Sequence, residues 1–485
     1  MSIPSHGALV EDASTTFRVW APAADRLTLV LDDRTRSMEP TGDGFFVLEG
    51  VDAPPGTRYR LRLDDEGLFP DPASRSQPAG VHGPSAVVDP QAYDWRDDDW
   101  AGVAREDLVV YELHVGAFSE AGTFDAVRER LSYLAGLGVT AIELMPVHDF
   151  PGQRNWGYDP AALFAPSRAY GRPDALRRLV DAAHRAGLAV LLDVVYNHFG
   201  PDGAYAPAFA PFLTDKYETP WGPAMNLDDE GAAGVRRFFV DNALHWLREY
   251  NVDGLRLDAT HALHDESTPH FLAELAAAVD EHVDGPERHL IAEDHRNLNR
   301  LVRPRDEDGY GLDGVWSDDL HHQCRVLTAG DHEGYYQDYQ GVTAGDIATS
   351  LNDGWFFRGE HSDYLDAPRG TDPVPVARDQ CVVFIQNHDQ VGNRPTGNRL
   401  TDDVSLPVYR ALSTLLFVVE EVPLLFMGQE WAASTPFQFF TDHNEKIGPS
   451  VTKGRTEEFE GFSGFEGDVP DPQAPSTFER RVLDW

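Results

Sequence analysis

Lysine is almost missing from this chain, because all of its 40 basic residues except Lys216, Lys446 and Lys453 are arginine. The basic residues face 81 acidic ones, which leaves a formal net charge of −41. This charge repels phosphate backbones and anionic lipids, and it argues against nucleic acid or membrane surfaces as partners. An acidic surface with little lysine is typical of proteins suited to high salt, where counterions screen the self-repulsion. Compositional drift in a GC-rich genome predicts the same pattern.

Cysteines and long apolar runs are also scarce. The two cysteines, Cys324 and Cys381, lie apart without metal-ligand spacing, which favours reduced, buried thiols over a disulfide framework. The chain has no run of about eighteen apolar residues and no charged-then-apolar leader at Met1. We therefore expect neither a membrane span nor a secretory signal, and predict a cytoplasmic protein. Its 485 residues, 41% of them hydrophobic, suffice for a barrel core and a smaller module.

The N-terminal part reads as a small β domain. Short alternating segments at 17–22, 26–31, 45–50 and 59–63 are separated by Gly, Pro and Asp. Such spacing predicts an antiparallel β-sandwich, which we place at residues 1–95. It carries no catalytic cluster. A polar, aromatic stretch follows, and we expect a linker at 96–106.

From residue 107 to 485 the pattern changes to alternating strands and helices. Amphipathic stretches such as 124–138 and 174–187 end in glycine, as helices often do. The eight apolar runs between them predict a (β/α)8 barrel, an α/β fold, with an irregular excursion at about 196–229. The runs lie at 109–115, 141–147, 189–195, 254–258, 290–294, 314–319, 382–389 and 423–430.

Asp258, Glu293 and Asp389 lie at or next to the C-terminal ends of three of these runs. A single such residue is more often a helix cap or a loop salt bridge, but the C-terminal strand ends of a barrel meet in one pocket. Glycosidic cleavage needs one protonated carboxyl and one carboxylate, and crowding separates the pKa values of neighbouring acids. Arg256 lies on the same face of its strand as Asp258 and can keep that aspartate ionised as a nucleophile.

Four short segments resemble, in order and spacing, the conserved regions of the α-amylase superfamily of glycoside hydrolases: D-V-V-Y-N-H (193–198), G-L-R-L-D-A-T-H (254–261), A-E-D (292–294) and N-H-D (387–389). Longer segments resemble the maltooligosyltrehalose trehalohydrolases of that superfamily. They are V-Y-E-L-H-V-G-A-F, M-P-V-H-D-F-P-G-Q-R-N-W-G-Y-D, W-S-D-D-L-H-H, N-H-D-Q-V-G-N-R and M-G-Q-E-W-A-A-S-T-P-F-Q-F-F-T-D-H. The resemblance implies hydrolysis of the α-1,4 bond next to the terminal trehalose of maltooligosyltrehalose, with retention of configuration.

The resemblance also implies roles for individual residues. Asp258 would be the nucleophile, Glu293 the general acid/base, and Asp389 the carboxylate that stabilises the transition state. Asp193 would orient Arg256. The side chains expected to contact sugar are Tyr158, His198, Arg256 and His388, with Trp156, Trp221 and residues 439–443 around the trehalose-binding pocket.

Maltooligosyltrehalose and related α-glucans are the partners that the resemblance implies, with no cofactor. Some superfamily members bind calcium through the asparagine matching Asn197, but the resemblance to trehalohydrolases calls for no metal. Two functional alternatives stay open. A glycogen branching enzyme would pass the glucan to a sugar hydroxyl, and a non-catalytic barrel would only bind it. The R-N-W-G-Y-D and F-F-T-D-H segments favour the hydrolase, and the complete set of three carboxylates argues against a pure binder.

Two features depart from the family pattern. Asp294 and His295 follow the expected acid, where related sequences usually carry a Ser-Asp or Asn-Asp pair. Family members also continue into an eighth barrel helix and a C-terminal β domain, whereas this sequence ends at Trp485. We therefore expect the barrel to lack its last helix, which would leave apolar surface beside the eighth strand exposed.

Overall fold

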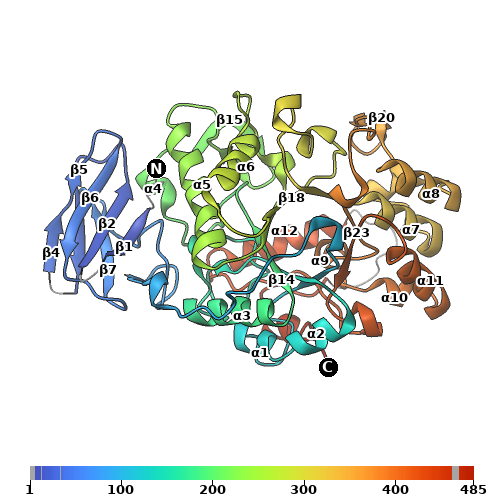
Figure 1. Cartoon of the computed structure of the whole chain (residues 1–485), viewed down its shortest axis with the longest axis horizontal. Coiled ribbons are helices and arrows are strands. Elements are labelled where there is room, and N and C mark those ends of the chain that lie inside the picture. The colour runs from blue at the N-terminus through green and yellow to red at the C-terminus, as the bar shows by residue number, and fades with distance from the viewer. Residues whose placement is uncertain (1–5, 12–13, 33, 461–468) are drawn as a thin grey trace.

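The computed structural model describes residues 6–11, 14–32, 34–460 and 469–485. Figure 1 shows the N-terminal strands as a separate layer at one end of a larger barrel. No helix in these ranges is long and apolar enough to cross a membrane.

The N-terminal region forms two antiparallel sheets, as the alternating pattern predicted. Side chains such as Phe17, Leu29 and Leu61 fill the core between the sheets, and all three are fully buried. One sheet contains β1 (Gly7–Glu11), β2 (Ser14–Trp20), β5 (Glu39–Pro40) and β6 (Phe45–Val51). The other contains β3 (Leu27–Leu31), β4 (Arg34–Ser37), β7 (Arg58–Leu63), β8 (Gly67–Phe69) and β9 (Ser85–Ala86).

The larger part is a closed barrel of eight parallel strands, which confirms the predicted (β/α)8 fold. Almost every strand residue is buried, because helices cover the outside and side chains fill the inside. The first strand pairs with the last and closes the barrel. In barrel order the strands are β10 (Val110–Leu113), β11 (Ala141–Leu144), β14 (Ala189–Val194), β17 (Gly254–Leu257), β18 (His289–Glu293), β19 (Gly314–Ser317), β22 (Cys381–Val383) and β23 (Val422–Phe426).

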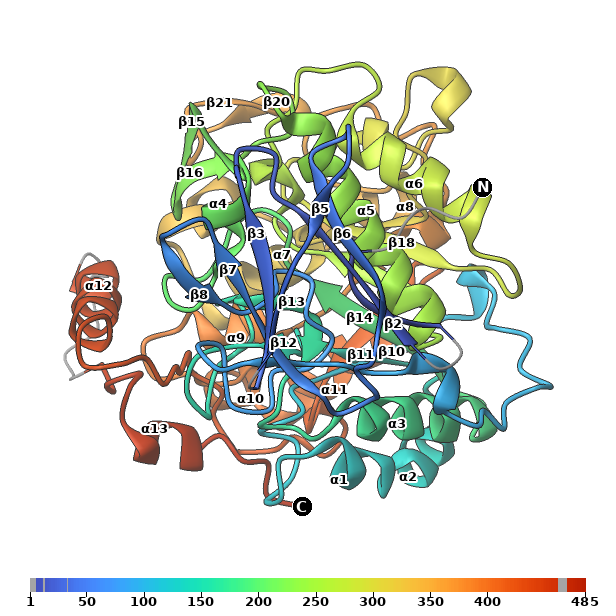
Figure 2. The same ribbon diagram turned by 90° about the vertical axis from the view of Figure 1, so that its left-hand side faces the viewer.

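The helices between these strands are amphipathic, with one apolar face and one polar face. In α3, for example, Leu176, Leu179 and Val180 are buried, and the helix contacts β14 and α1. Together they form the outer layer visible in Figures 1 and 2. Their bounds are α1 (Phe124–Arg128), α2 (Leu131–Leu137), α3 (Pro173–Arg185), α5 (Ala232–Glu249), α6 (Phe271–His282), α7 (Asp319–Ala329), α8 (Ala344–Asp353), α10 (Leu400–Asp403) and α11 (Leu406–Leu416).

Several insertions extend the loops after the strands. The excursion predicted as irregular contains helix α4 (Ala206–Phe209) and a hairpin of β15 (Leu213–Thr219) and β16 (Gly222–Met225). Two further hairpins, β12 (His148–Asp149) with β13 (Ala162–Pro166) and β20 (Arg358–Ser362) with β21 (Ala367–Gly370), were not predicted. After β23 the chain forms α12 (Gly448–Glu460) and α13 (Pro475–Glu479), and Figure 2 shows α12 projecting from the side of the barrel.

A buried ion pair fastens the N-terminal region to the barrel. Arg75 donates to the Glu249 carboxylate on α5 through Nε at 2.9 Å and Nη2 at 2.6 Å. Its Nη1 donates to the carbonyl of His6 at 2.9 Å. His6 in turn contacts Asp241 of the same helix at 2.6 Å. The two parts therefore meet along one face of α5.

Candidate active site

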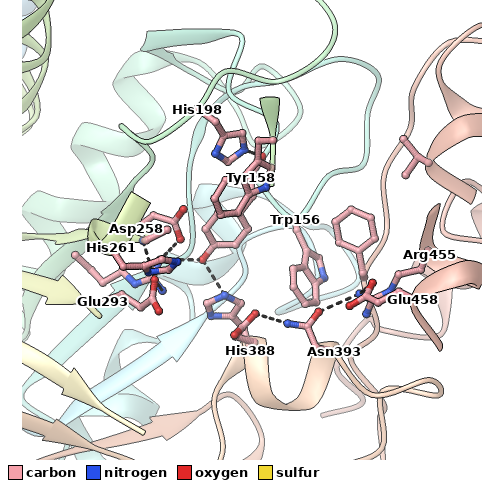
Figure 3. Close-up of a pocket in the computed structure, with 16 residues that line it drawn as sticks. Trp156, Tyr158, His198, Asp258, His261, Glu293, His388, Asn393, Arg455 and Glu458 are labelled. Carbon is pink, nitrogen blue, oxygen red and sulfur yellow. Dashed lines mark hydrogen bonds and ion pairs between the residues drawn. The ribbon is translucent and has the colours of Figure 1, made fainter. Parts of the chain in front are cut away.

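A cavity of about 410 Å³ opens among the loops that follow the barrel strands. The three expected catalytic residues line this cavity, and so do the six individual side chains expected to bind sugar. Figure 3 labels six of these nine: Trp156, Tyr158, His198, Asp258, Glu293 and His388. The described residues that line the cavity are Trp156, Tyr158, His198, Trp221, Arg256, Asp258, Ala259, His261, Glu293, His388, Asp389, Asn393, Phe439, Val451, Arg455 and Glu458.

The barrel brings the three carboxylates together from separate strands. Asp258 directly follows β17, and Glu293 is the last residue of β18. Asp389 lies beyond the end of β22, in the first turn of helix α9 (His388–Gly392). The strand predicted to run through residue 389 is thus shorter, because Asn387 caps a helix there and its side chain accepts a hydrogen bond from the Gln390 amide.

Arg256 is the positive centre of the site. Its Nη1 donates to Asp258 at 2.7 Å and to Asp193 at 2.8 Å, and its Nη2 lies 3.6 Å from Glu293. The guanidinium is buried and packs against the Trp316 ring at 4.4 Å. One cation therefore serves three carboxyl groups, and Asp193 holds it in place from below.

Burial and mutual repulsion shift the pKa values of the acidic side chains in the site. The pKa of Asp258 is raised above its usual value by burial and by the charge of Glu293, against the opposing effect of Arg256. The pKa of Asp389 is raised by burial, with Glu293 contributing again. Glu293 accepts a hydrogen bond from the Ala259 amide at 2.7 Å, which fixes its orientation toward Asp258. A cluster of this kind can hold one acid protonated beside an ionised neighbour.

The residues expected to contact sugar differ in exposure. The Tyr158 hydroxyl donates to Asp193 at 2.5 Å, and His198 lies flat against Trp221 at a ring separation of 4.7 Å. Trp221 is 46% exposed, which suits a binding platform. Trp156 is only 3% exposed, because its ring stacks on Phe437 and its Nε1 donates to the Gln438 carbonyl. Trp156 therefore forms part of the cavity wall and does not offer an exposed ring face on which a sugar could stack.

Of residues 439–443, only Phe439 lines the cavity. Asp442 accepts hydrogen bonds from Arg154 at 2.7 Å and from the Gln153 amide at 2.8 Å. His443 lies 3.2 Å from Asp159. Asp442 and His443 thus hold the 153–159 loop, which carries Trp156 and Tyr158, and do not line the cavity.

Sequence reasoning missed part of the wall. Asn393 donates to Asp389 at 2.6 Å, and its spacing of four residues along α9 was a signal that could have identified it. Arg455 and Glu458 come from the distant helix α12, and no sequence pattern connected that helix with the site. His261 stood in a quoted segment without a role. It lies beside His295, with the ring centroids 4.5 Å apart.

The departure after Glu293 has a local structural explanation. Asp294 is buried, accepts from the Thr260 hydroxyl at 2.8 Å and pairs with Arg296 at 2.6 Å. It therefore ties the loop after β17 to the loop after β18, next to Glu293 in the sequence. Within the described ranges, no group of three or more His, Cys, Asp or Glu side chains is arranged to hold a metal ion.

Comparison with known proteins identifies the family. The α-amylase catalytic-domain model matches residues 68–209 and 225–455. The chain is 47% identical to the malto-oligosyltrehalose trehalohydrolase of Deinococcus radiodurans, over 98% of this chain and 77% of that protein. A solved structure of a putative α-amylase from Salmonella typhimurium superimposes with a TM-score of 0.94 at 42% identity, covering 99% of this chain and 82% of that one.

A 1,4-α-glucan branching enzyme of Pseudoalteromonas atlantica is more distant, at 30% identity over 64% of this chain and 50% of its own length. The resemblance to trehalohydrolases, by contrast, extends over nearly the whole chain. The chain therefore belongs to the malto-oligosyltrehalose trehalohydrolases, within the α-amylase family of glycoside hydrolases.

Proposed function

We propose that this glycoside hydrolase releases trehalose from maltooligosyltrehalose, with Asp258 as nucleophile, Glu293 as general acid/base and Asp389 as the group that stabilises the transition state. The observation that carries the assignment is the convergence of these three carboxyls on one cavity, with Asp258 and Glu293 both beside Arg256. Family membership supplies the substrate class.

The first step forms a bond between an Asp258 carboxylate oxygen and the anomeric carbon of the glucan. The α-1,4 bond to trehalose breaks as Glu293 transfers its proton to the departing oxygen. Arg256 supports this step because its hydrogen bond to one Asp258 oxygen favours the ionised carboxylate and leaves the other oxygen free to attack. Trehalose leaves as a neutral sugar, and the glucan remains covalently bound to Asp258.

In the second step Glu293 acts as a base, where it acted as an acid before. Glu293, now ionised, removes a proton from water, whose oxygen attacks the anomeric carbon and displaces Asp258. The product is a shorter maltooligosaccharide in the α configuration. In this mechanism Asp389 and His388 bond sugar hydroxyls, and these hydrogen bonds strengthen in the transition state. Because Asn393 bonds only one Asp389 oxygen, the other is available to a hydroxyl.

From the position of Glu293 we infer which side of the cavity binds the trehalose end of the substrate and which side binds the glucan end. In Figure 3, Glu293, Asp258 and His261 lie on one side of His388, whereas Trp156, Asn393 and Arg455 lie on the other. The leaving trehalose must emerge beside the acid, so we assign it to the His261 side. Trp156 and Phe439, which were expected around the trehalose pocket, then face the glucan.

The assignment is tested by incubating the purified chain with maltotriosyltrehalose and separating the sugars released. We expect trehalose and maltotriose in equal amounts from the wild-type protein, and a loss of several orders of magnitude in Asp258→Asn. Maltopentaose serves as the comparison substrate, because polar groups built for the second trehalose glucose stay unpaired with it. Equal kcat/KM for both sugars would indicate a general amylase, and new branch points would indicate a transferase.

A further inference from the structure

Two glutamates lie inside the barrel beneath the cavity and have no place in the reaction described above. Glu112 on β10 and Glu143 on β11 are register partners, and both are fully buried. Carboxylates are seldom buried without a partner of opposite charge. Glu143 Oε2 has no hydrogen-bond partner among the described residues. The protonation state of this pair therefore requires an explanation.

Glu112 forms hydrogen bonds with His388 at two points. Its Oε2 accepts the backbone N–H of His388 at 2.8 Å, and its Oε1 is hydrogen-bonded to the ring Nδ1. The opposite ring nitrogen, Nε2, lies 2.9 Å from the Tyr158 hydroxyl. That hydroxyl also contacts Asp193 at 2.5 Å. An unbroken chain of hydrogen bonds thus runs from Glu112 through His388 and Tyr158 to the Asp193–Arg256 pair.

The direction of this chain follows from counting protons. Tyr158 has one hydroxyl proton, and if it goes to Asp193, the phenol oxygen must accept from Nε2–H of His388. A neutral imidazole then carries a lone pair on Nδ1, so the proton between Nδ1 and Glu112 belongs to Glu112. Reversing every donor gives the alternative for a neutral ring, in which Asp193 is protonated and Glu112 is ionised. An imidazolium beside an ionised Glu112 is disfavoured, because burial lowers the pKa of His388 to about 4.

Arg256 decides between the two arrangements. It donates to the same Asp193 oxygen that contacts Tyr158, at 2.8 Å, and a cation at that distance stabilises the carboxylate. Burial raises the pKa of Asp193 well above its usual value, and the charges of Asp258 and Glu143 raise it further, whereas Arg256 and the Tyr158 hydroxyl favour its ionised form. We give the direct contact with the guanidinium the greater weight, because a neutral Glu143 removes part of that opposing charge. Among the described residues, no lysine or arginine contacts Glu112. The arrangement with an ionised Asp193 and a protonated Glu112 is therefore the stable one.

The pKa shifts of Glu112 and His388, at the other end of this series of hydrogen bonds, agree with that arrangement. Burial raises the pKa of Glu112 to about 8 and lowers the pKa of His388 to about 4, so both are neutral near pH 7. The groups that face Glu112 are Glu143, whose pKa burial also raises to about 8, together with His388 and the more distant Arg256. Deprotonation of either glutamate would place an uncompensated charge inside the barrel.

We propose that Glu112 is a positioning residue that acts as a neutral carboxylic acid: it donates to Nδ1 of His388 and thereby keeps Nε2–H available as a donor to the sugar in the cavity. The inference deepens the proposed function and rests on it. On substrate binding, a sugar hydroxyl replaces the Tyr158 oxygen as acceptor of Nε2–H. Loss of the Glu112 proton moves the imidazole proton to Nδ1 and removes the donor, so activity falls on the alkaline side.

Glutamine at position 112 separates this proposal from a purely structural role. Its carbonyl can accept the His388 N–H while its amide donates to Nδ1, as the neutral acid does, but it cannot lose a proton. We expect Glu112→Gln to keep kcat within about threefold of wild type and to lose the alkaline decline assigned to Glu112. Glu112→Ala, which removes the donor, should lose ~10-fold or more in kcat. The matched control is Glu143→Gln, which makes the same change without touching His388 and should keep an alkaline decline.

Labelling the histidine rings with ¹⁵N gives a readout that does not need activity. The resonances of His388, assigned by their absence in His388→Gln, should report a neutral ring protonated at Nε2 near pH 7 in wild type and in Glu112→Gln. A ring protonated at Nδ1, or a Glu112→Gln variant as slow as Glu112→Ala, would overturn the proposal. Failure of trehalose release with the Nε2–H tautomer intact would instead count against the proposed substrate. If Glu112→Ala does not fold, the glutamine variant and the spectra still decide.

Discussion

Arg455 offers the sharpest test of how the wall of the cavity is organised, because it acts on a carboxyl that it does not touch. Its Nη1 donates to Asn393 Oδ1 at 3.0 Å and its Nη2 donates to the Gly392 carbonyl at 2.6 Å. By occupying the amide oxygen, Arg455 forces the Asn393 NH2 group toward Asp389, where it donates at 2.6 Å. Removing Arg455 frees the amide to turn its oxygen toward the Asp389 carboxylate.

The size of the effect follows from that single bond. A hydrogen bond to a charged acceptor contributes about 1.5–3 kcal/mol. If Asp389 needs that bond only in the transition state, its loss slows turnover by about 10- to 150-fold. Arg455→Met should approach this loss, since methionine keeps the apolar cover over Phe439 and Phe459, whose rings lie 5.4 and 4.5 Å from the guanidinium. Asn393→Ala should give a loss of similar size.

The assay is steady-state hydrolysis of maltotriosyltrehalose, with kcat and KM determined separately. We expect kcat to fall and KM to change little, because the ground-state contacts of the sugar remain. The control is Lys453→Met on the same helix, where the side chain is 74% exposed and pairs only with Glu457 in the described structure. A wild-type kcat in Arg455→Met, or a rise in KM alone, would refute the reasoning.

Three further outcomes follow from the same structure. The first sugar released from the glucan side should appear as the α-anomer, monitored by NMR, since the mechanism is retaining; the β-anomer first would mean inversion. Glu249→Gln should cost roughly 3–5 kcal/mol in the free energy of unfolding, because it leaves Arg75 buried without its partner. The folded pKa of Glu249 lies well below its usual value, so the stability from this carboxylate is full above the unfolded pKa and is lost as pH falls, which Tm against pH will show. Finally, the net charge of −41 predicts a higher Tm as KCl rises from ~0.1 to ~1 M, because the screening length shortens from about 10 to about 3 Å; an unchanged Tm would favour compositional drift.

The barrel could be predicted because its strands are buried on both faces and therefore read as short apolar runs. Asp258 and Glu293 could be placed for the same reason, since each closes such a run. Asp389 was placed in the correct cavity although its strand ends earlier, because helix α9 continues toward the same end of the barrel. Carboxyls at strand ends thus tolerate an error of several residues in the strand boundary.

The remaining parts of the site depend on contacts that no local pattern contains. Arg455 reaches Asn393 from a helix that follows the last barrel strand, and only the fold connects the two. An aromatic residue in a loop also does not reveal its exposure. Trp156 and Trp221 looked equivalent in the sequence, yet Phe437 covers one of them and the other remains open to solvent.

Glu112 and Glu143 show the opposite case, in which a visible signal was not used. Each interrupts an apolar barrel strand with a carboxyl, V-Y-E-L and A-I-E-L, where an uncharged residue would be expected. The reason for their presence appears only when the charges are considered together. Arg256 contacts Asp193 and Asp258 and lies near Glu293, so its charge is already committed at the mouth of the barrel.

In the described part of the chain, Glu112 and Glu143 lie below that level with no cation in contact, and each is more stable there when protonated. The depth of each acidic side chain in the barrel therefore determines whether it is protonated or ionised. Asp193 and Asp258, within reach of the guanidinium, can be ionised and take part in electrostatics at the reacting carbon. Glu112, one layer deeper, serves as a neutral donor. His388 connects it to the cavity, because Nδ1 of the ring contacts Glu112 and Nε2 contacts the Tyr158 hydroxyl.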